Sequence, residues 1–205
     1  MNFDPIIVIH GEPNSIFSEI FFKSFKKLKI KKTIILISSY KLLKLQMRKL
    51  NFNIKIRLIN VNNLKKLKLD NKSINLIDVD FNQNKAFSKI SKKSNNFIKN
   101  SFKLAFKLIK KEGVKRIING PISKKYFLGN QFLGITEYIS KHFSKKETCM
   151  LIFNKELSVS PMTTHLPIKL ISQNINKNNI INKIKLIDKF YRLNFKIKPK
   201  IGILG

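Results

Sequence analysis

Pro5-Ile6-Ile7-Val8-Ile9, followed directly by His10-Gly11-Glu12-Pro13, is the stretch that decides the fold class of this chain. An unbroken apolar run of this length is typical of a parallel strand that is buried on both faces. After the glycine turn, Ser15 is a suitable helix N-cap, and the apolar spacing of residues 16–28 predicts a helix. This strand, turn and helix predict an α/β fold. The expected core positions of the helix are Ile16, Phe17, Ile20, Phe21 and Leu28.

The same alternation of strands and helices continues along the chain. Apolar runs predict strands at 33–37, 54–59, 74–79 and 114–119, and the strand at 54–59 alternates as a more exposed strand does. Ser38-Ser39 should cap a helix that extends through Met47, and Ile180, Ile184, Ile187 and Tyr191 mark a late amphipathic helix. The pattern therefore predicts a parallel sheet with helices between its strands.

The clearest helix is predicted from Asn95 to Lys111. Gly113 is placed to end it as a C′ residue. The core stripe and a lysine row lie on different faces, and the lysine row is expected to face solvent. The stripe is Ile98, Phe102, Ala105 and Ile109, and the row is Lys99, Lys103, Lys107 and Lys111.

The composition argues against a specific nucleic-acid-binding protein, although the formal net charge is +31 over 205 residues. Only four of the 42 basic residues are arginine, the residue best suited to bidentate base and phosphate contacts. The lysines are dispersed, and 17 phenylalanines with a hydrophobic fraction of 43% can build a core. A solvated basic surface with nonspecific polyanion binding at low salt is the expectation.

The single cysteine and the N-terminal residues indicate the cellular compartment in which this protein is expected. Cys149 cannot form an internal disulfide, and there is no cysteine cluster for zinc. Met1-Asn2-Phe3-Asp4 has no secretory pattern, and the longest apolar runs are too short to span a bilayer. We expect a cytoplasmic protein without a membrane partner.

Met162-Thr163-Thr164-His165-Leu166-Pro167 is the first candidate functional stretch. It follows a strand-like run at 151–159, and the carboxyl ends of strands are where α/β sheets usually place function. Neutral imidazole is a common metal ligand, so His165 is a candidate ligand, whereas a lone histidine is more often structural.

Two more stretches combine a glycine turn with a helix start. Asn119-Gly120-Pro121-Ile122-Ser123-Lys124 ends a predicted strand and carries a lysine, which is either a surface residue or a site residue. Phe132-Leu133-Gly134-Ile135-Thr136-Glu137-Tyr138 opens a helix that runs to about Phe143. Thr136 is either its N-cap or a hydroxyl that faces an anion at the helix start.

Together, the stretches at 119–124, 132–138 and 163–167 resemble the 4-hydroxythreonine-4-phosphate dehydrogenase family of pyridoxal phosphate biosynthesis. Gly11-Glu12-Pro13 with Ser18-Glu19-Ile20 resembles the N-terminal motif of that family. The resemblance covers the whole chain. It implies a three-layer α/β/α fold like that of isocitrate and isopropylmalate dehydrogenases, with the site between two domains. Residues 1–126 would form the nucleotide-side domain, and 127–205 would begin the metal, substrate and dimer domain.

The resemblance also implies an activity and its cofactors. The family oxidises 4-phosphohydroxy-L-threonine with NAD or NADP and one divalent ion of the Zn, Mg, Mn or Co class, as a homodimer. The product is a 3-oxo acid, which decarboxylates to 3-amino-2-oxopropyl phosphate. A metal can act as a Lewis acid on the hydroxyl that is oxidised, and it can stabilise the enolate that forms as CO₂ leaves.

Site residues follow by position in the motifs. His165 would be one of three metal histidines, Thr136 would contact the phosphate end of the substrate, and Lys124 would lie near the cleft. Ile135 stands where the family usually has a histidine, and Ser123 stands where a histidine or asparagine often precedes the lysine. No cofactor-binding residue can be assigned.

The chain ends in an apolar run, Lys200-Ile201-Gly202-Ile203-Leu204-Gly205, which predicts the start of a strand. This end lies just before the Asn-Pro-His-Ala-Gly stretch of the family. We therefore expect a C-terminally truncated fragment that lacks the other metal histidines, is inactive alone and is poorly soluble.

Three alternatives stay open. The first is a related dehydrogenase for another phosphorylated four-carbon hydroxy acid. This alternative is favoured by Ile135, which stands where the family usually has histidine. The second is a non-catalytic homologue. The third is a basic nucleic-acid-binding protein, which would need a clustered cationic face and aromatic platforms.

Overall fold

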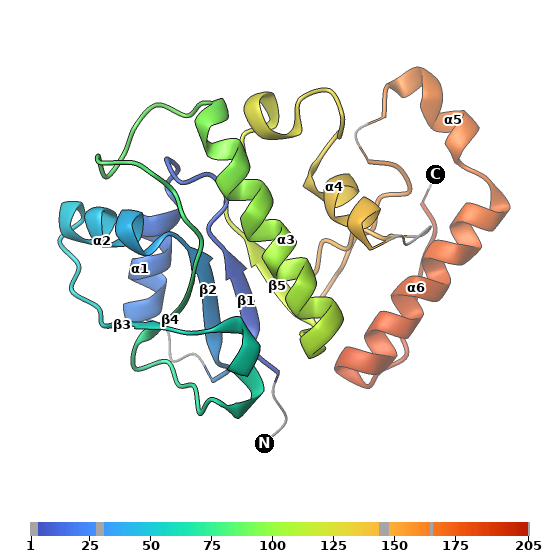
Figure 1. Cartoon of the computed structure of the whole chain (residues 1–205). Helices are drawn as coiled ribbons and strands as arrows, with labels where there is room; N and C mark the ends of the chain where they lie inside the picture. Colours follow the sequence, from blue (N-terminus) through green and yellow to red (C-terminus); the bar gives the residue numbers. More distant parts are fainter. Residues whose placement is uncertain (1–3, 28–30, 144–147, 165, 205) are drawn as a thin grey trace. The chain divides into compact units, whose positions relative to one another are not determined.

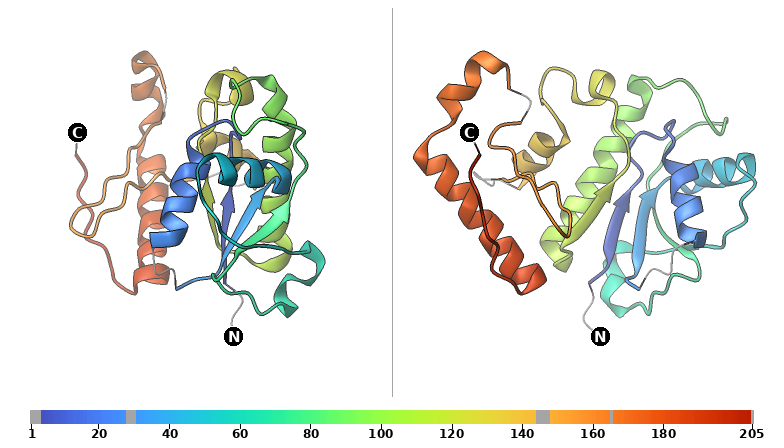
Figure 2. Two further views of the ribbon diagram at one scale, coloured as in Figure 1. Left: turned by 90° about the vertical axis from the view of Figure 1, so that its left-hand side faces the viewer. Right: turned by 180° about the vertical axis from the view of Figure 1, so that it is seen from behind.

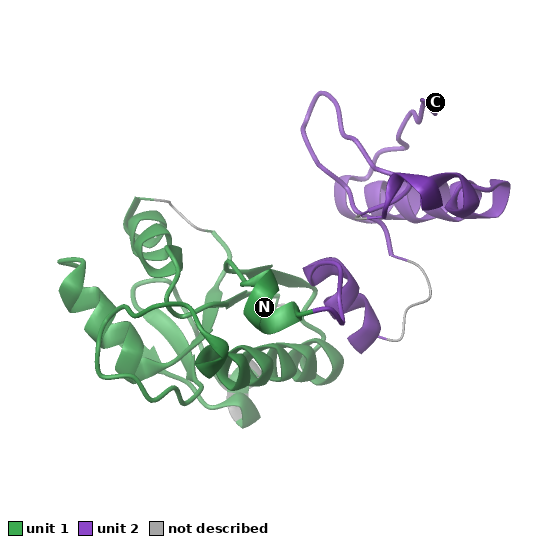
Figure 3. Cartoon of the chain, turned by 90° about the horizontal axis from the view of Figure 1, so that it is seen from above, with its two compact units in different colours: residues 1–129 green, residues 130–205 purple. Residues whose placement is uncertain are grey.

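The computed structural model describes residues 4–27, 31–143, 148–164 and 166–204. The chain folds as two compact units, residues 1–129 (unit 1) and residues 130–205 (unit 2), shown in two colours in Figure 3. The roles assigned above to residues 1–126 and 127–205 stay predictions.

Unit 1 is built on a five-stranded parallel sheet with the strand order β3-β4-β2-β1-β5 (Figure 1). Every neighbouring pair of strands in this order is parallel. The predicted α/β fold and each predicted strand of this unit are confirmed, with shifts of one or two residues at the ends. The strands are β1 (Ile6–Ile9), β2 (Ile34–Ser38), β3 (Ile56–Leu58), β4 (Ile74–Asp78) and β5 (Arg116–Asn119).

The position of each strand in the sheet agrees with its pattern of exposure. β1 and β2 are central, and Ile7, Ile9 and Leu36 are fully buried. β3 is an edge strand with Leu58 exposed, as its alternating sequence predicts. β5 forms the other edge, and Ile118 is 54% exposed there.

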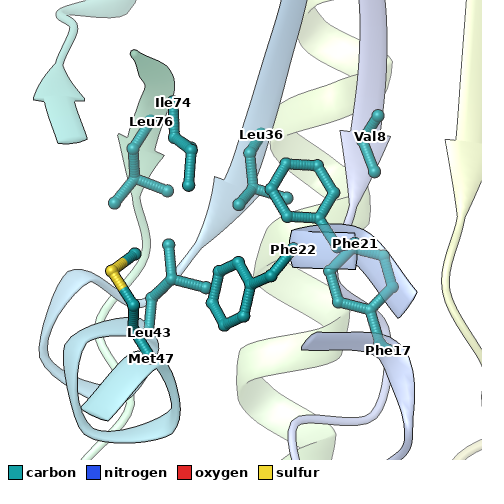
Figure 4. Close-up of a cluster of buried hydrophobic side chains, with 9 residues drawn as sticks. All are labelled: Val8, Phe17, Phe21, Phe22, Leu36, Leu43, Met47, Ile74 and Leu76. Carbon is teal, nitrogen blue, oxygen red and sulfur yellow. The ribbon is translucent and has the colours of Figure 1, made fainter. Parts of the chain in front are cut away.

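One face of the sheet is covered by α1 (Phe17–Lys27) and α2 (Tyr40–Lys49), as Figure 2 shows. Phe21 and Phe22 of α1 and Leu43 of α2 pack against Leu36 and other strand residues in a hydrophobic cluster (Figure 4). Burial of these side chains is the main favourable term in folding such a unit. The full cluster is Val8, Phe17, Phe21, Phe22, Leu36, Leu43, Met47, Ile74 and Leu76.

The starts of both helices follow the predicted capping. The Ser15 hydroxyl accepts a hydrogen bond from the Phe17 amide at 3.3 Å, and Ser39 accepts one from the Leu42 amide at 3.4 Å. The predicted core face of α1 is partly wrong, because Ile16 is 59% exposed and Ile20 is 52% exposed. The bulkier phenylalanines occupy the side that faces the sheet, and the isoleucines lie outside it. Leu28 lies outside the described residues.

The opposite face of the sheet carries α3 (Asn95–Glu112) (Figure 2). Its core stripe is confirmed at Ile98, Phe102 and Ala105, and the four predicted lysines are exposed. Gly113 ends the helix at φ 70°, a left-handed conformation that favours glycine. The short helices of this unit are η1 (Val61–Lys66), η2 (Lys92–Ser94) and η3 (Lys124–Leu128).

Unit 2 contains α4 (Ile135–His142), η4 (Ile168–Leu170), α5 (Ile171–Asn174) and α6 (Lys177–Phe195). Ile180, Ile184, Ile187 and Tyr191 form a partly covered face of α6, as predicted. No helix within the described ranges is both long enough and apolar enough to cross a membrane.

Two predicted strands of unit 2 are not found among its described residues. The run at 151–159 forms one antiparallel bridge between Ile152 and Val159, with N–O distances of 2.8 and 3.0 Å. Residues 200–204 have no regular secondary structure and no strand partner in the described part of the chain. A run of apolar residues becomes a strand only where a neighbouring segment completes its hydrogen-bond ladder.

Candidate functional site

The strands that follow β1 in the sequence are added first on one side of β1 and then, with β5, on its other side. β2 and β4 lie on one side of β1, and β5 lies on the other. In open α/β sheets, ligands usually bind at such a switch point, outside the carboxyl ends of the strands. The turns that follow β1 and β5 are therefore the expected location of a ligand site in this unit.

These two turns approach each other so closely that glycine is required. A Cβ on Gly120 would lie 2.0 Å from the carbonyl oxygen of His10, and Gly11 has φ +75°. The Glu12 amide donates to the carbonyl oxygen of Pro121 at 2.8 Å, which fastens one turn to the other. The close approach of the two turns thus explains why Gly11 and Gly120 are glycines.

Glu12 is buried in the turn after β1. Its Oε1 accepts hydrogen bonds from the Ser94 hydroxyl at 2.9 Å and from the Asn14 amide at 3.1 Å. Its Oε2 is buried and has no hydrogen-bond partner among the described residues. The carboxylate therefore holds this turn to the chain just before α3. The sequence indicated this residue only through the weak Gly-Glu-Pro match.

His10 belongs to the same buried region and has a structural role. Ser18 donates its one hydroxyl proton to Gln46 Oε1 at 2.5 Å, so its oxygen accepts from His10 Nε2 at 3.4 Å. Nδ1 then accepts from the Ser38 hydroxyl at 2.6 Å. Full burial lowers the pKa of His10 to about 3, so the ring is neutral at physiological pH.

The stretch after β5 begins η3. The Ser123 hydroxyl accepts a hydrogen bond from the Tyr126 amide at 3.3 Å, so Ser123 caps this short helix. Lys124, the candidate site lysine, is the first residue of η3, and its side chain is exposed. It belongs to unit 1, whereas the other candidates belong to unit 2.

In unit 2, α4 places Ile135 and Thr136 in its first turn. Gly134 is the N-cap, so the expectation that Thr136 is the N-cap is wrong. Gly134 adopts an extended conformation and leaves Ile135 and Thr136 as the first and second helical residues, whose amides have no partner within the helix. Both side chains are half-buried.

The next residue of α4 connects two of the motif stretches. Glu137 Oε1 accepts a hydrogen bond from the Thr164 hydroxyl at 3.1 Å. Glu137 Oε2 is buried and has no partner among the described residues. The residue that follows Thr136 and the residue that precedes His165 are therefore in direct contact.

The side chain of Lys183 in α6 binds backbone carbonyl groups of the segment that leads into the stretch at 163–167. Its ammonium group donates to the carbonyl oxygens of Pro161 at 3.0 Å and Met162 at 2.7 Å. Sequence reasoning missed this residue, because one more lysine on a helix of a lysine-rich chain carries no distinguishing signal.

The metal ligand set is not found in the part of the chain that the structure describes. His165 lies outside the described residues, and within them no three His, Cys, Asp or Glu side chains gather as a metal ion would require. His10 is buried in unit 1, and His142 Nδ1 is 2.9 Å from the Tyr138 carbonyl oxygen. The described residues therefore do not form a complete metal site.

Comparison with known proteins agrees with the motifs. The family model described as "Pyridoxal phosphate biosynthetic protein PdxA" matches residues 30–205. A 4-hydroxythreonine-4-phosphate dehydrogenase of Sulfurihydrogenibium is 32% identical over 200 residues, which is 95% of this chain and 60% of that protein. The enzyme of the same name from Aquifex aeolicus is 34% identical over 91 residues, 43% of this chain and 28% of that protein.

Solved structures show the same fold. A 4-hydroxythreonine-4-phosphate dehydrogenase from Klebsiella pneumoniae superposes with a TM-score of 0.79 at 20% identity, over 92% of this chain and 59% of that one. The corresponding protein from Burkholderia phymatum gives a TM-score of 0.77 at 20% identity, over 92% and 58%. The chain thus spans at most about 60% of the length of these relatives.

Proposed function

Since the chain belongs to the PdxA family of pyridoxal phosphate biosynthetic proteins, we propose that it acts in the NAD(P)-dependent oxidation of 4-phosphohydroxy-L-threonine. The carbon that bears the free hydroxyl loses a hydride to nicotinamide, and the hydroxyl proton is released. The resulting 3-oxo acid loses its carboxylate carbon as CO₂ and leaves 3-amino-2-oxopropyl phosphate.

The observation that carries this proposal is the contact between two motif stretches. The hydrogen bond from Thr164 to Glu137 joins the stretch at 132–138 to the stretch at 163–167. These stretches are far apart in the sequence, and each contributes one proposed site residue next to the contact. Residues that act on one small substrate must be held within a few ångströms of each other.

Each site residue has a proposed role. Thr136 binds the phosphate end of the substrate with its hydroxyl and backbone amide. Ile135 has no side-chain donor where the family usually has histidine, so only its backbone amide is available there. Lys124 is the proposed catalytic lysine, from its position in the stretch at 119–124.

The cofactors and the assembly are proposed from the family. They are NAD or NADP, one divalent ion with His165 among its ligands, and a homodimer. Within the described residues, no three His, Cys, Asp or Glu side chains gather as such an ion would require. No part of the proposed substrate-binding roles of Thr136 or Ile135 depends on the ion.

A second candidate function is supported by Ile135. Another phosphorylated four-carbon hydroxy acid would suit a site in which the histidine donor has been replaced by an apolar side chain.

The test uses protein expressed from its complete gene. NADH or NADPH formation is followed with 4-phosphohydroxy-L-threonine and with its 2-hydroxy analogue, with and without divalent ions. The amino substrate should turn over in a metal-dependent way, and His165→Ala should abolish turnover. His142→Ala is the matched control and should retain it. Turnover of the 2-hydroxy analogue alone would establish the second candidate, and no turnover of either would refute both.

A further inference from the structure

Unit 1 contains a pocket of about 250 Å³ that is lined by α2 and by residues 52–56, which lead into β3. This volume is below the roughly 300–1,000 Å³ of pockets for drug-sized molecules, so it suits a ligand with about one ring. All the lining residues belong to unit 1. No residue of the motif stretches is among the described residues that line it. A ligand bound here would therefore occupy a site of its own.

The inner wall of this pocket is apolar and fixed in place. Met47 is buried, and the Phe52 ring packs on the core residue Phe22 with ring centroids 5.3 Å apart. The Phe52 amide donates to the Met47 carbonyl oxygen at 2.9 Å, and the Ile54 amide donates to Met47 Sδ at 3.5 Å. Asn51 makes the preceding turn in the left-handed conformation, at φ 56°, which asparagine adopts more readily than most residues. The wall is therefore formed before a ligand arrives, which lowers the cost of binding.

The rim of the pocket is cationic. Lys44 and Arg48 are exposed and lie four residues apart on α2, where like charges repel each other. Neither forms an ion pair within the described residues, and no described acidic residue lines the pocket. An anion placed between these two side chains would remove their repulsion and accept charge-assisted hydrogen bonds from both.

Positive charge also lies against the two aromatic rings of the pocket. The Lys44 ammonium is 5.1 Å from the centre of the Tyr40 ring, and the Lys26 ammonium of α1 is 5.1 Å from the centre of the Phe52 ring. The Asp78 carboxylate is close to the start of α2, but its Oδ1 accepts a hydrogen bond from the Tyr40 amide at 2.7 Å. Apolar surface and positive charge are therefore adjacent, which is the combination that an aromatic anion requires.

We propose that this pocket binds a small aromatic phosphate, with its ring against Met47 and Phe52 and its phosphate held by Lys44 and Arg48. The planar guanidinium of Arg48 can donate two parallel hydrogen bonds to a phosphate, and the Lys44 ammonium adds a second positive charge. A flat ring gains more here than an aliphatic group, because it can stack on Phe52 and contact the Met47 sulfur. A phosphate monoester, with its higher charge, matches two cations better than a carboxylate does. The proposal does not depend on the proposed function.

The test compares ligands by isothermal titration calorimetry on protein expressed from its complete gene. The salt concentration is about 0.15 M, which screens attraction to the overall charge beyond about 8 Å. Phenyl phosphate should bind the wild type about 10-fold or more tightly than inorganic phosphate, which lacks the ring, and than phenol, which lacks the phosphate. It should bind about 3-fold more tightly than cyclohexyl phosphate, whose ring is not aromatic.

Variants locate the site. Lys44→Met combined with Arg48→Met should weaken the binding of phenyl phosphate about 10-fold or more. The matched control, Lys103→Met combined with Lys107→Met, removes the same charge from exposed positions with the same spacing on α3, and should change the affinity about 2-fold or less. Asn53→Asp places a carboxylate at an exposed lining position with little change in size, and it should also weaken binding. Equal losses in the two double variants would indicate attraction to the overall charge and overturn the proposal.

The wild-type comparison decides the proposal even if a variant fails to fold. No binding of phenyl phosphate, or binding no tighter than that of inorganic or cyclohexyl phosphate, refutes it. Displacement of phenyl phosphate by 4-phosphohydroxy-L-threonine would assign it to the substrate site and also refutes the proposal. NADH formation judges the dehydrogenase separately, since no described residue of this pocket is proposed to take part in that reaction.

Discussion

Unit 1 and unit 2 differ in how far each completes a hydrophobic core. All the described apolar residues that are buried lie in unit 1, except Tyr138. Unit 2 instead exposes large apolar side chains, among them Leu157 at 75% and Leu193 at 61%. Since burial of apolar surface is the main driving force for folding, unit 1 should carry most of the stability of this chain.

Buried polar groups do not follow this difference. In unit 1, His10 and Gln46 are linked through the Ser18 hydroxyl, and Gln46 also donates to the Pro13 carbonyl oxygen. Glu12 Oε2 of the same unit is nevertheless buried without a hydrogen-bond partner among the described residues, as is Glu137 Oε2 of unit 2. The two units therefore differ in apolar burial and not in how completely their buried polar groups are bonded.

The largest expected effect comes from a core deletion in unit 1. Phe22 is fully buried and packs against Phe52, with ring centroids 5.3 Å apart. Phe22→Ala should lower the free energy of unfolding by about 3–5 kcal/mol. The matched change in unit 2, Phe153→Ala, removes a half-exposed ring and should cost about 1 kcal/mol or less. Hydrogen exchange of the amides in each unit measures both, and equal losses would contradict the comparison.

A smaller loss is expected where two turns of unit 1 touch. Gly120→Ala places a methyl group against the backbone of His10, so the turns after β1 and β5 must separate. We expect a loss of about 2–3 kcal/mol. Gly202→Ala in unit 2 meets no atom within 4 Å and should change stability by about 0.5 kcal/mol or less. Urea denaturation compares the two variants, and a neutral Gly120→Ala would show that the turns are not in contact.

The third effect depends on pH. The folded pKa of His10 is about 3, below the ordinary value of 6.5. The unfolded chain therefore takes up a proton below pH 6.5 that the folded chain does not, and stability falls as pH decreases toward 3. Between neutral pH and pH 5 the loss should be roughly 2 kcal/mol.

Two variants isolate this pH effect. His10→Gln should flatten the loss of stability between neutral pH and pH 5, whereas His142→Gln in unit 2 should keep it, because that variant retains His10. Thermal unfolding followed by circular dichroism gives the slopes. An unchanged slope in His10→Gln would mean that another group is responsible.

The smallest effects concern surface ion pairs. Asp4 of unit 1 pairs with Lys32 and Arg116, and the hydrogen bonds from these two cations lower the pKa of Asp4. Asp4→Asn should cost about 1 kcal/mol or less, and Arg192→Gln, which breaks a pair with Asp188 in unit 2, about 0.5 kcal/mol or less. Both losses should shrink in high salt, and a salt-independent loss would indicate a packing effect instead.

The sequence predicted the sheet of unit 1 well because its strands are buried on both faces. Such strands appear as unbroken apolar runs, as at 5–9 and 33–37, and their position does not depend on distant partners. The face of α1 was partly mistaken, since Ile16 and Phe17 are adjacent and both apolar, and only packing decides which is buried.

The candidate site was less predictable, because it depends on contacts between distant segments. The motifs identified Thr136 as a site residue and contain Thr164, but nothing in the sequence shows that Glu137 bonds to Thr164. The runs at 151–159 and 200–204 have strand-like composition, yet composition does not supply a partner strand. The metal-ligand role of His165 stays a prediction, which the turnover experiment tests.

The lysine row of α3 has a consequence for how this protein responds to its solvent. Lys99, Lys103, Lys107 and Lys111 are exposed and follow one another at intervals of four residues, so each repels the next. Dissolved ions weaken that repulsion, and they do so across a surface with a formal net charge of +31. Moderate salt should therefore raise the melting temperature of this protein, and the helix that covers the back of the sheet should gain protection from exchange as the salt concentration rises.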